Sequence, residues 1–203
     1  PDMVGEICRR IEALPGEHPR VGVPSLGEYP KFFTDALYET GAEIVDITEA
    51  FVVAKAPKAP YELQLIQEAS DLAIAAFEEV VKYIRPGVTE KEVIGYAEGY
   101  LRAHGAEDLL ILSRGEYPHA FINRPTFRCI EKDDLFVFSV EIAGVYGYWT
   151  QIIRPIFLSR GCHREAYEVL CQVKEAIQAG VEKFRPGNLI CDVDEAINRV
   201  ARK

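Results

Sequence analysis

The sequence contains an internal repeat, and this repeat constrains the fold more than any other feature. The segment Val80-Val-Lys-Tyr-Ile-Arg-Pro-Gly87 is similar to Gly180-Val-Glu-Lys-Phe-Arg-Pro-Gly187, one hundred residues later. Each copy follows one amphipathic helical pattern and precedes another, so that Val93 in the first copy corresponds to Val193 in the second. The repeat therefore predicts a duplicated unit of two helices and a sheet.

The two copies differ beyond their second helical pattern. In the first copy this pattern leads into a long region of strand and loop character, whereas the second copy reaches Lys203 within or just after its second helix. A single complete half, without its second copy, would leave apolar faces of its helices and sheet exposed to solvent. We therefore expect a second half that is cut short and lacks its sheet.

The residues before the repeat have a different organisation. Two short apolar runs, Arg20–Val23 and Glu43–Ile47, flank a helical pattern and predict a β-α-β segment. The segment Lys55–Pro60 contains two prolines and marks a change in composition. We expect a domain boundary there, with one domain over residues 1–57 and a second over residues 58–203.

The second predicted domain alternates helical and strand patterns, which indicates an α/β (α+β) fold. Thr89 and Glu92 have the spacing of a capping box at the start of a helix. The other expected elements are a long helix over 63–84, a strand over 109–112, a hairpin of 135–142 with 148–158, and helices after Gly161.

The composition restricts the function classes. The hydrophobic share of 48% and the charged share of 27% are typical of globular proteins. The net charge of −9 argues against a non-specific binder of nucleic acid or anionic membrane. Neither a transmembrane run nor a signal-peptide pattern is found, so a cytoplasmic location is expected. The five cysteines form no C-x-x-C pair, which argues against a disulfide framework and a structural zinc site.

Several short motifs occur in the order found in one known family. They are Lys58-Ala-Pro-Tyr-Glu62, Arg-Pro-Gly-x-Thr-Glu90, a proline-flanked His119, Asp134 before a strand, and Gly147-Tyr-x-x-x-x-x-Arg154. In this order the chain resembles the first half of the pita-bread family, which includes aminopeptidase P, Xaa-Pro dipeptidase (prolidase), methionine aminopeptidase and creatinase. The resemblance implies an incomplete pita-bread fold over residues 58–203, preceded by the end of a creatinase-type N-terminal domain. It also implies an active site between two halves and a homodimer.

The resemblance also assigns the metal-ligand positions. Peptidases of this family hold two divalent metal ions through two aspartates on the hairpin, together with one His and two Glu residues from the second half. The family spacing places the two aspartates at Val140 and Gln151, neither of which carries a carboxylate. Glu141 is adjacent to the first position, but it needs a β-bulge to turn toward the site. No cofactor is therefore expected. A divalent metal ion (Mn, Zn or Co) is expected only if Glu141 replaces the missing ligand.

Three further residues are candidates for substrate chemistry. His119 matches the family histidine near the scissile bond, which is the proton-transfer group in creatinase, and imidazole suits this role; an ordinary loop histidine is the alternative. Arg154 matches a family arginine on the second hairpin strand. Its planar fork suits a substrate carboxylate, although a structural ion pair with Glu141 or another sheet carboxylate is the favoured interpretation. Tyr148 is assigned to substrate binding with it, and the neighbouring Trp149 is interpreted as a core or dimer-packing residue.

Three functions are compatible with these residues, and whether the protein is an enzyme stays open among them. The first is metal-independent hydrolysis of a C–N bond in a small polar molecule, with His119 as the catalytic group. The second is an Xaa-Pro dipeptidase or aminopeptidase that acts on short peptides with a bound metal. The third is a non-catalytic module that binds a peptide or a protein. In each case we expect these 203 residues alone to be inactive.

Overall fold

The computed structural model describes residues 2–115, 122–161 and 163–202. The chain divides into two compact units, Pro1–Leu63 and Gln64–Lys203. The border between them lies inside helix α4 (Pro60–Tyr83), shortly after the proline-rich segment. The domain boundary after residue 57 stays a prediction.

The first unit is built on two parallel strands, β1 (Arg20–Val23) and β2 (Glu43–Asp46), which are joined through helix α2 (Lys31–Glu39). This arrangement confirms the β-α-β prediction. Its small core consists of Ile11, Val23, Leu37 and Ala42. The unit also contains α1 (Met3–Glu12), the 3₁₀ turn η1 (Leu26–Glu28) and α3 (Thr48–Lys55).

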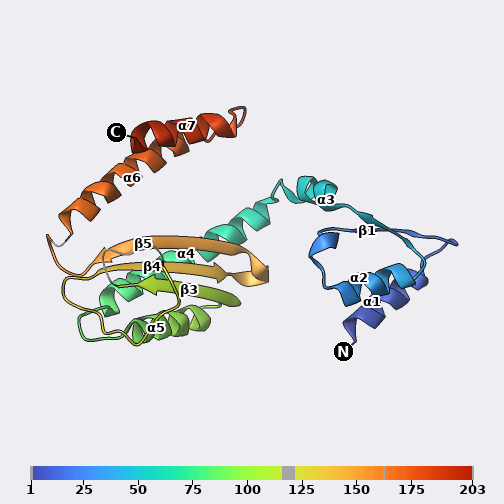
Figure 1. The fold of residues 1–203 in the computed structure, drawn as a ribbon, viewed down its shortest axis with the longest axis horizontal. Coiled ribbons are helices and arrows are strands. Elements are labelled where there is room, and N and C mark those ends of the chain that lie inside the picture. The colour runs from blue at the N-terminus through green and yellow to red at the C-terminus, as the bar shows by residue number, and fades with distance from the viewer. Residues whose placement is uncertain (1, 116–121, 162, 203) are drawn as a thin grey trace. The chain divides into compact units, whose positions relative to one another are not determined.

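The second unit contains an antiparallel sheet in the order β3-β4-β5 (Figure 1). Strands β4 and β5 form the predicted hairpin, and their pairing runs without interruption from Leu135 opposite Phe157 to Ala143 opposite Trp149. The ladder therefore contains no β-bulge. The strands are β3 (Asp108–Arg114), β4 (Leu135–Ala143) and β5 (Trp149–Phe157), with the turn η2 (Val145–Gly147) between the last two.

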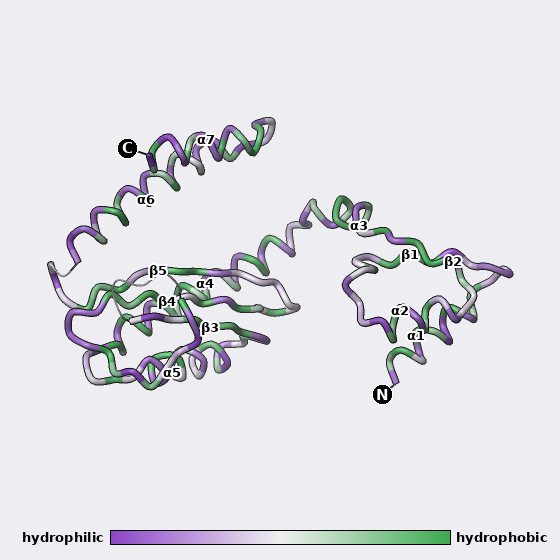
Figure 2. The backbone as a smooth tube through the Cα atoms, viewed as in Figure 1, coloured by the Kyte–Doolittle hydropathy of each residue, from purple (hydrophilic) through white to green (hydrophobic). Residues whose placement is uncertain are grey.

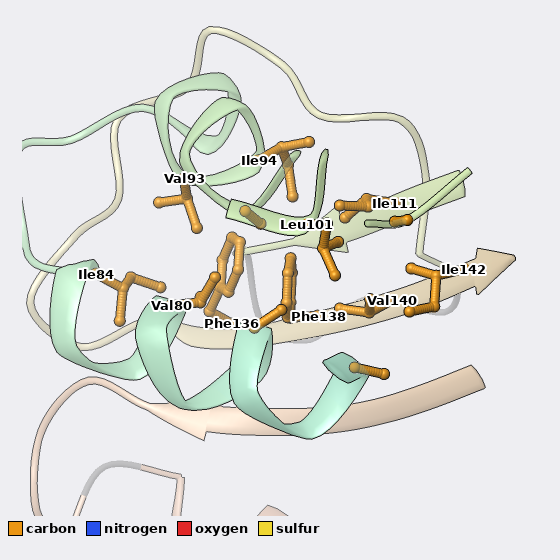
Figure 3. Packing of buried hydrophobic residues seen from close by; sticks show 14 of the residues in the cluster. Val80, Ile84, Val93, Ile94, Leu101, Ile111, Phe136, Phe138, Val140 and Ile142 are labelled. Atoms are coloured by element: carbon orange, nitrogen blue, oxygen red, sulfur yellow. The ribbon is translucent and has the colours of Figure 1, made fainter. Parts of the chain in front are cut away.

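Helices α4 and α5 (Glu90–Ala103) contribute to one hydrophobic core with this sheet. Alternate residues of β4 point into this core, because successive side chains of a strand face opposite sides. In Figure 3, Phe136, Phe138, Val140 and Ile142 lie between the strands and the helices, and all four are fully buried. Figure 2 shows the corresponding hydrophobic stretches along the strands. One face of the sheet thus packs against the helices, and the opposite face carries Ser139, Glu141 and Gln151 among apolar residues.

The start of α5 confirms the predicted capping box. The hydroxyl of Thr89 accepts a hydrogen bond from the backbone N–H of Glu92 at 3.2 Å, and the Glu92 carboxylate accepts one from the backbone N–H of Thr89 at 2.7 Å. Each group satisfies a donor that the first helical turn leaves free.

The second copy of the repeat forms a second helix pair, α6 (Arg164–Lys183) and α7 (Ile190–Ala201). The two turns have the same backbone geometry, with φ of 95° at Gly87 and 93° at Gly187, a region that favours glycine. Helices α6 and α7 approach closely at Gly180, where an added Cβ would lie 2.6 Å from Cγ1 of Ile197. The structure confirms the duplicated helix–turn–helix. Within the described residues, no helix is long and apolar enough to cross a membrane.

Candidate functional site

The two positions that the family spacing assigns to metal ligands lie on opposite faces of the hairpin. Val140 pairs with Ile111 on one side and Ile152 on the other, and its side chain belongs to the hydrophobic core with 0% exposure (Figure 3). Gln151 pairs with Glu141, so it belongs to the opposite face. A site on that face therefore cannot include the side chain at position 140.

Glu141, Gln151 and Ser139 form a polar cluster on this second face, which we call the Glu141 cluster. The Gln151 amide nitrogen donates to Oε1 of Glu141 at 2.9 Å and to the hydroxyl of Ser139 at 3.3 Å. Glu141 does point away from the Val140 face, as the sequence predicted. Without a bulge, the regular ladder brings Glu141 opposite Gln151 instead.

The chemistry of these donors does not fit a two-metal centre. Such a centre needs several carboxylates around two cations, and Glu141 is the one carboxylate between Leu135 and Phe157. One of its oxygens already accepts a hydrogen bond from the Gln151 amide. Among the described residues, no group of three or more His, Cys, Asp or Glu side chains is arranged to hold a metal ion.

Arg154 is not brought together with the Glu141 cluster. Arg154 pairs with Phe138 and so belongs to the face opposite Glu141, where it is exposed and donates to the backbone carbonyl of Ile153 at 2.7 Å. The alternative pairing of Arg154 with Glu141 was therefore wrong.

Two aromatic residues lie at the hairpin turn. Tyr148 is half-buried, and its carbonyl accepts a hydrogen bond from the N–H of Gly144 at 2.9 Å, which closes the turn. Trp149 is 53% exposed, so it is not a core residue of this chain, and its alternative role in dimer packing stays a prediction. His119 lies outside the described residues. The roles of His119, Arg154 and Tyr148 in substrate chemistry stay predictions.

A buried carboxylate that sequence reasoning missed lies at the first residue of α5. Glu90 is 2% exposed, and its carboxylate accepts hydrogen bonds from the N–H of Gly115 at 3.0 Å and from the N–H and hydroxyl of Thr126 at 2.9 and 2.8 Å. Its position after a helix N-cap suggested no more than an interaction with the helix dipole. No local pattern indicates these partners, because they come from distant parts of the chain.

A partly buried ion pair lies beside Glu90. The guanidinium of Arg128 donates to both oxygens of Asp134 at 2.6 and 2.8 Å, and Asp134 also accepts from the N–H of Glu131 at 2.8 Å. The hydrogen bond to Asp134 raises the pKa of Arg128 above its usual value, although partial burial of the guanidinium acts in the opposite direction. Asp134, which directly precedes β4, is thus held by an ion pair with Arg128.

Comparisons with known proteins agree on one family. The model of metallopeptidase family M24 matches residues 64–203. The uncharacterized peptidase YqhT of Bacillus subtilis (strain 168) is 28% identical over 155 residues, which cover 72% of this chain and 42% of that protein. Creatinase of Bacillus sp. (strain B-0618) is 27% identical over 188 residues, which cover 83% of this chain and 42% of creatinase.

A solved structure extends this likeness to the fold. The prolidase from Pyrococcus horikoshii OT3 superposes with a TM-score of 0.82 at 21% identity, over 99% of this chain and 57% of the prolidase chain. This superposition confirms the expected pita-bread fold. The chain spans about half the length of the relatives it matches.

Proposed function

The chain belongs to metallopeptidase family M24, and from this premise we propose that it is part of a hydrolase that cleaves a C–N bond in a small polar substrate. We propose further that the described hairpin holds no metal pair in this reaction. The observation that carries this proposal is the 2.9 Å hydrogen bond from the Gln151 amide to Glu141. A neutral donor there occupies the carboxylate oxygen that a bridging cation would need.

In the proposed reaction, His119 transfers the proton. The neutral imidazole of His119 takes a proton from the attacking water as the C–O bond forms. The resulting imidazolium then gives this proton to the departing nitrogen as the C–N bond breaks. Imidazole suits this step because its unperturbed pKa is about 6.5, close to neutral pH. Glu141 and Gln151 supply an acceptor and a donor on one face of the hairpin, which suits a polar substrate.

The proposal is tested by measuring amine release by the full-length protein from a panel of small N-substituted amides and Xaa-Pro dipeptides, before and after treatment with a chelator. We expect turnover to survive chelation and to be lost in His119→Ala. His18→Ala is the matched control, because His18 belongs to the first unit. Full activity of His119→Ala would refute the assignment of the proton-transfer group.

The second candidate function is an Xaa-Pro metallopeptidase, and the position of Glu141 favours it. Glu141 faces the same side as Gln151 without a bulge, so it is available as a single carboxylate ligand if other ligands are supplied. Elemental analysis of the purified full-length protein distinguishes the two functions. Stoichiometric Mn, Zn or Co would favour the metallopeptidase, and its absence together with turnover would favour the metal-independent hydrolase.

A further inference from the structure

We propose that Glu141 and Trp149 form a binding subsite for an alkylated ammonium group, which the substrate carries outside its reacting C–N bond. The inference rests on the proposed function for the identity of this ligand as a substrate, whereas the subsite itself is a feature of the hairpin. Glu141 belongs to the face of the sheet opposite the core, and strands β4 and β5 bring Trp149 next to it (Figure 1). The charge, the aromatic surface and the apolar neighbours of this face together define the ligand class.

Glu141 carries a charge that no cationic side chain of the described chain neutralises. Its Oε1 atom accepts the hydrogen bond from the amide of Gln151, which is neutral. Within residues 2–115, 122–161 and 163–202, no Lys, Arg or His forms an ion pair with Glu141, and no donor is bound to its Oε2 atom. Glu141 is half-buried, and partial removal of a carboxylate from water is unfavourable without a partner. A cation bound beside Oε2 supplies this partner.

The register of the hairpin places an indole ring beside this carboxylate. Trp149 pairs with Ala143, two residues after Glu141 on β4, so it is the diagonal neighbour of Glu141 on the same face. Diagonal neighbours in an antiparallel pair are about 7–8 Å apart, which is within the reach of large side chains. Trp149 is 53% exposed, so a ligand can contact its ring. Tryptophan attracts a cation over its ring face more strongly than the other aromatic residues do.

Gln151 orients the carboxylate without neutralising it. Its amide nitrogen donates to Glu141 at 2.9 Å and to the hydroxyl of Ser139 at 3.3 Å. Ser139 is fully buried, so it provides a fixed anchor for the amide. A basic residue at position 151 would hold Glu141 equally well, but it would also cancel the charge. The neutral donor therefore keeps Glu141 available to an external cation.

The neighbouring side chains favour an alkylated ammonium over a primary one. Leu110 lies directly opposite Glu141 on β3, and Ile153 follows Gln151 on the same face of β5. A primary ammonium has three N–H donors that water satisfies, and these aliphatic side chains offer no acceptors to replace the water. An alkylated ammonium gives up fewer hydrogen bonds, and its methyl groups pack against the same side chains.

The test is a titration of the full-length protein with choline, followed by tryptophan fluorescence at constant ionic strength. Choline carries a trimethylammonium group. Dimethylbutanol has the same shape with a neutral carbon in place of the nitrogen, and ethanolamine has a primary ammonium. We expect choline to quench the fluorescence of Trp149 saturably and to bind about tenfold more tightly than dimethylbutanol, with ethanolamine also weaker than choline. Trp149→Phe identifies the signal of Trp149, the one tryptophan among these 203 residues.

Two variants and a matched control, measured by calorimetry, assign the subsite to its residues. Glu141→Gln keeps the size of the side chain and removes the charge, so it should weaken choline binding by about tenfold. Trp149→Leu removes the aromatic ring and should weaken binding by roughly twofold to thirtyfold. Glu98→Gln removes the same charge from an exposed position on α5. This control should bind choline as the unmodified protein does.

Equal affinity of the unmodified protein for choline and dimethylbutanol would overturn the inference, and this result does not depend on the folding of any variant. Unchanged choline binding by Glu141→Gln, or an equal loss in Glu98→Gln, would overturn it as well. The proposed function fails separately. If choline binds beside Trp149 but no amide that carries a trimethylammonium group is hydrolysed, the subsite stands and the hydrolase does not. Turnover of uncharged amides without choline binding would support the hydrolase and overturn the subsite.

Discussion

Replacing Val140 by Asp restores a carboxylate at the position given by the family spacing, and we expect it to destabilise the fold rather than to create a metal site. The Val140 side chain is fully buried between the sheet and helices α4 and α5. Burying an unpaired carboxylate costs several kcal/mol even after relaxation, and each buried methyl group lost costs about 0.8 kcal/mol. The expected loss at neutral pH is about 4–6 kcal/mol, which approaches the whole stability of an ordinary domain.

The pH dependence of this loss distinguishes a buried carboxyl from a packing defect. Burial raises the pKa of the introduced carboxyl in the folded state above its unfolded value of about 3.9. The protonated form is therefore the better tolerated one. The variant should be least destabilised below about pH 4, and its free energy of unfolding should fall by up to about 1.4 kcal/mol per pH unit above that, until the folded-state pKa is reached.

The assay is urea unfolding followed by circular dichroism across this pH range, with and without MnCl₂. Val140→Thr is the control, because it has nearly the same shape and adds a hydroxyl that does not titrate; it should lose about 1–3 kcal/mol at every pH. A loss for Val140→Asp that does not change with pH, or stabilisation of that variant by Mn²⁺, would refute the assignment of Val140 to the buried face.

Three further changes test other parts of the structure. Gln151→Asp places a second carboxylate opposite Glu141, so it should lose about 0.2–1 kcal/mol; Mn²⁺ should restore this stability in urea unfolding, and no effect of Mn²⁺ would argue against the shared face. Gly180→Ala brings a Cβ to 2.6 Å from Ile197, so it should lower the free energy of unfolding by about 1–3 kcal/mol, and adding Ile197→Val should restore part of it. Gly99→Ala, at an exposed site in α5 with open space around it, should raise that free energy by about 0.5–1 kcal/mol, and a lower melting temperature would contradict it.

The helices, turns and hairpin were predictable because their signals are local. Amphipathic spacing, the capping box at Thr89 and the Arg-Pro-Gly turns each lie within a few consecutive residues, and the structure places α4, α5, α6 and α7 accordingly. Helices α1 and α3 were missed. In α3 no residue is buried, so its sequence lacks the contrast between an apolar and a polar face.

The composition of the site was harder to predict, because it depends on strand register. Val140 and Gln151 are eleven residues apart, whereas partners in this ladder differ by an even number of residues, as Glu141 and Gln151 do. An odd separation puts two residues on opposite faces unless a bulge intervenes. Counting positions along the chain cannot detect whether a bulge is present.

Glu90 and Glu92, both in the first turn of α5, differ in whether their partners are close in the sequence. Glu92 has its partner three residues away, so its role could be predicted from spacing. The partners of Glu90 are Gly115 and Thr126, which are distant in the sequence and lie near Glu90 only in the folded chain. The repeat supports this distinction, because α7 begins at Ile190 with the same turn and no buried carboxylate.

Comparison of the two copies shows that the helix pair forms whether or not a sheet packs against it. Ala73 in α4 is buried in the core, whereas its equivalent Val173 in α6 is 45% exposed, yet both copies keep the same turn and the same pair of helices. The helix–turn–helix therefore depends on its own capping and close packing, such as the contact of Gly180 with Ile197. The sheet beside the first copy adds different features, namely the Glu141 cluster and the partners of Glu90. These polar contacts therefore lie at two separate places of the first copy, on the hairpin face opposite the helices and at the first residue of α5.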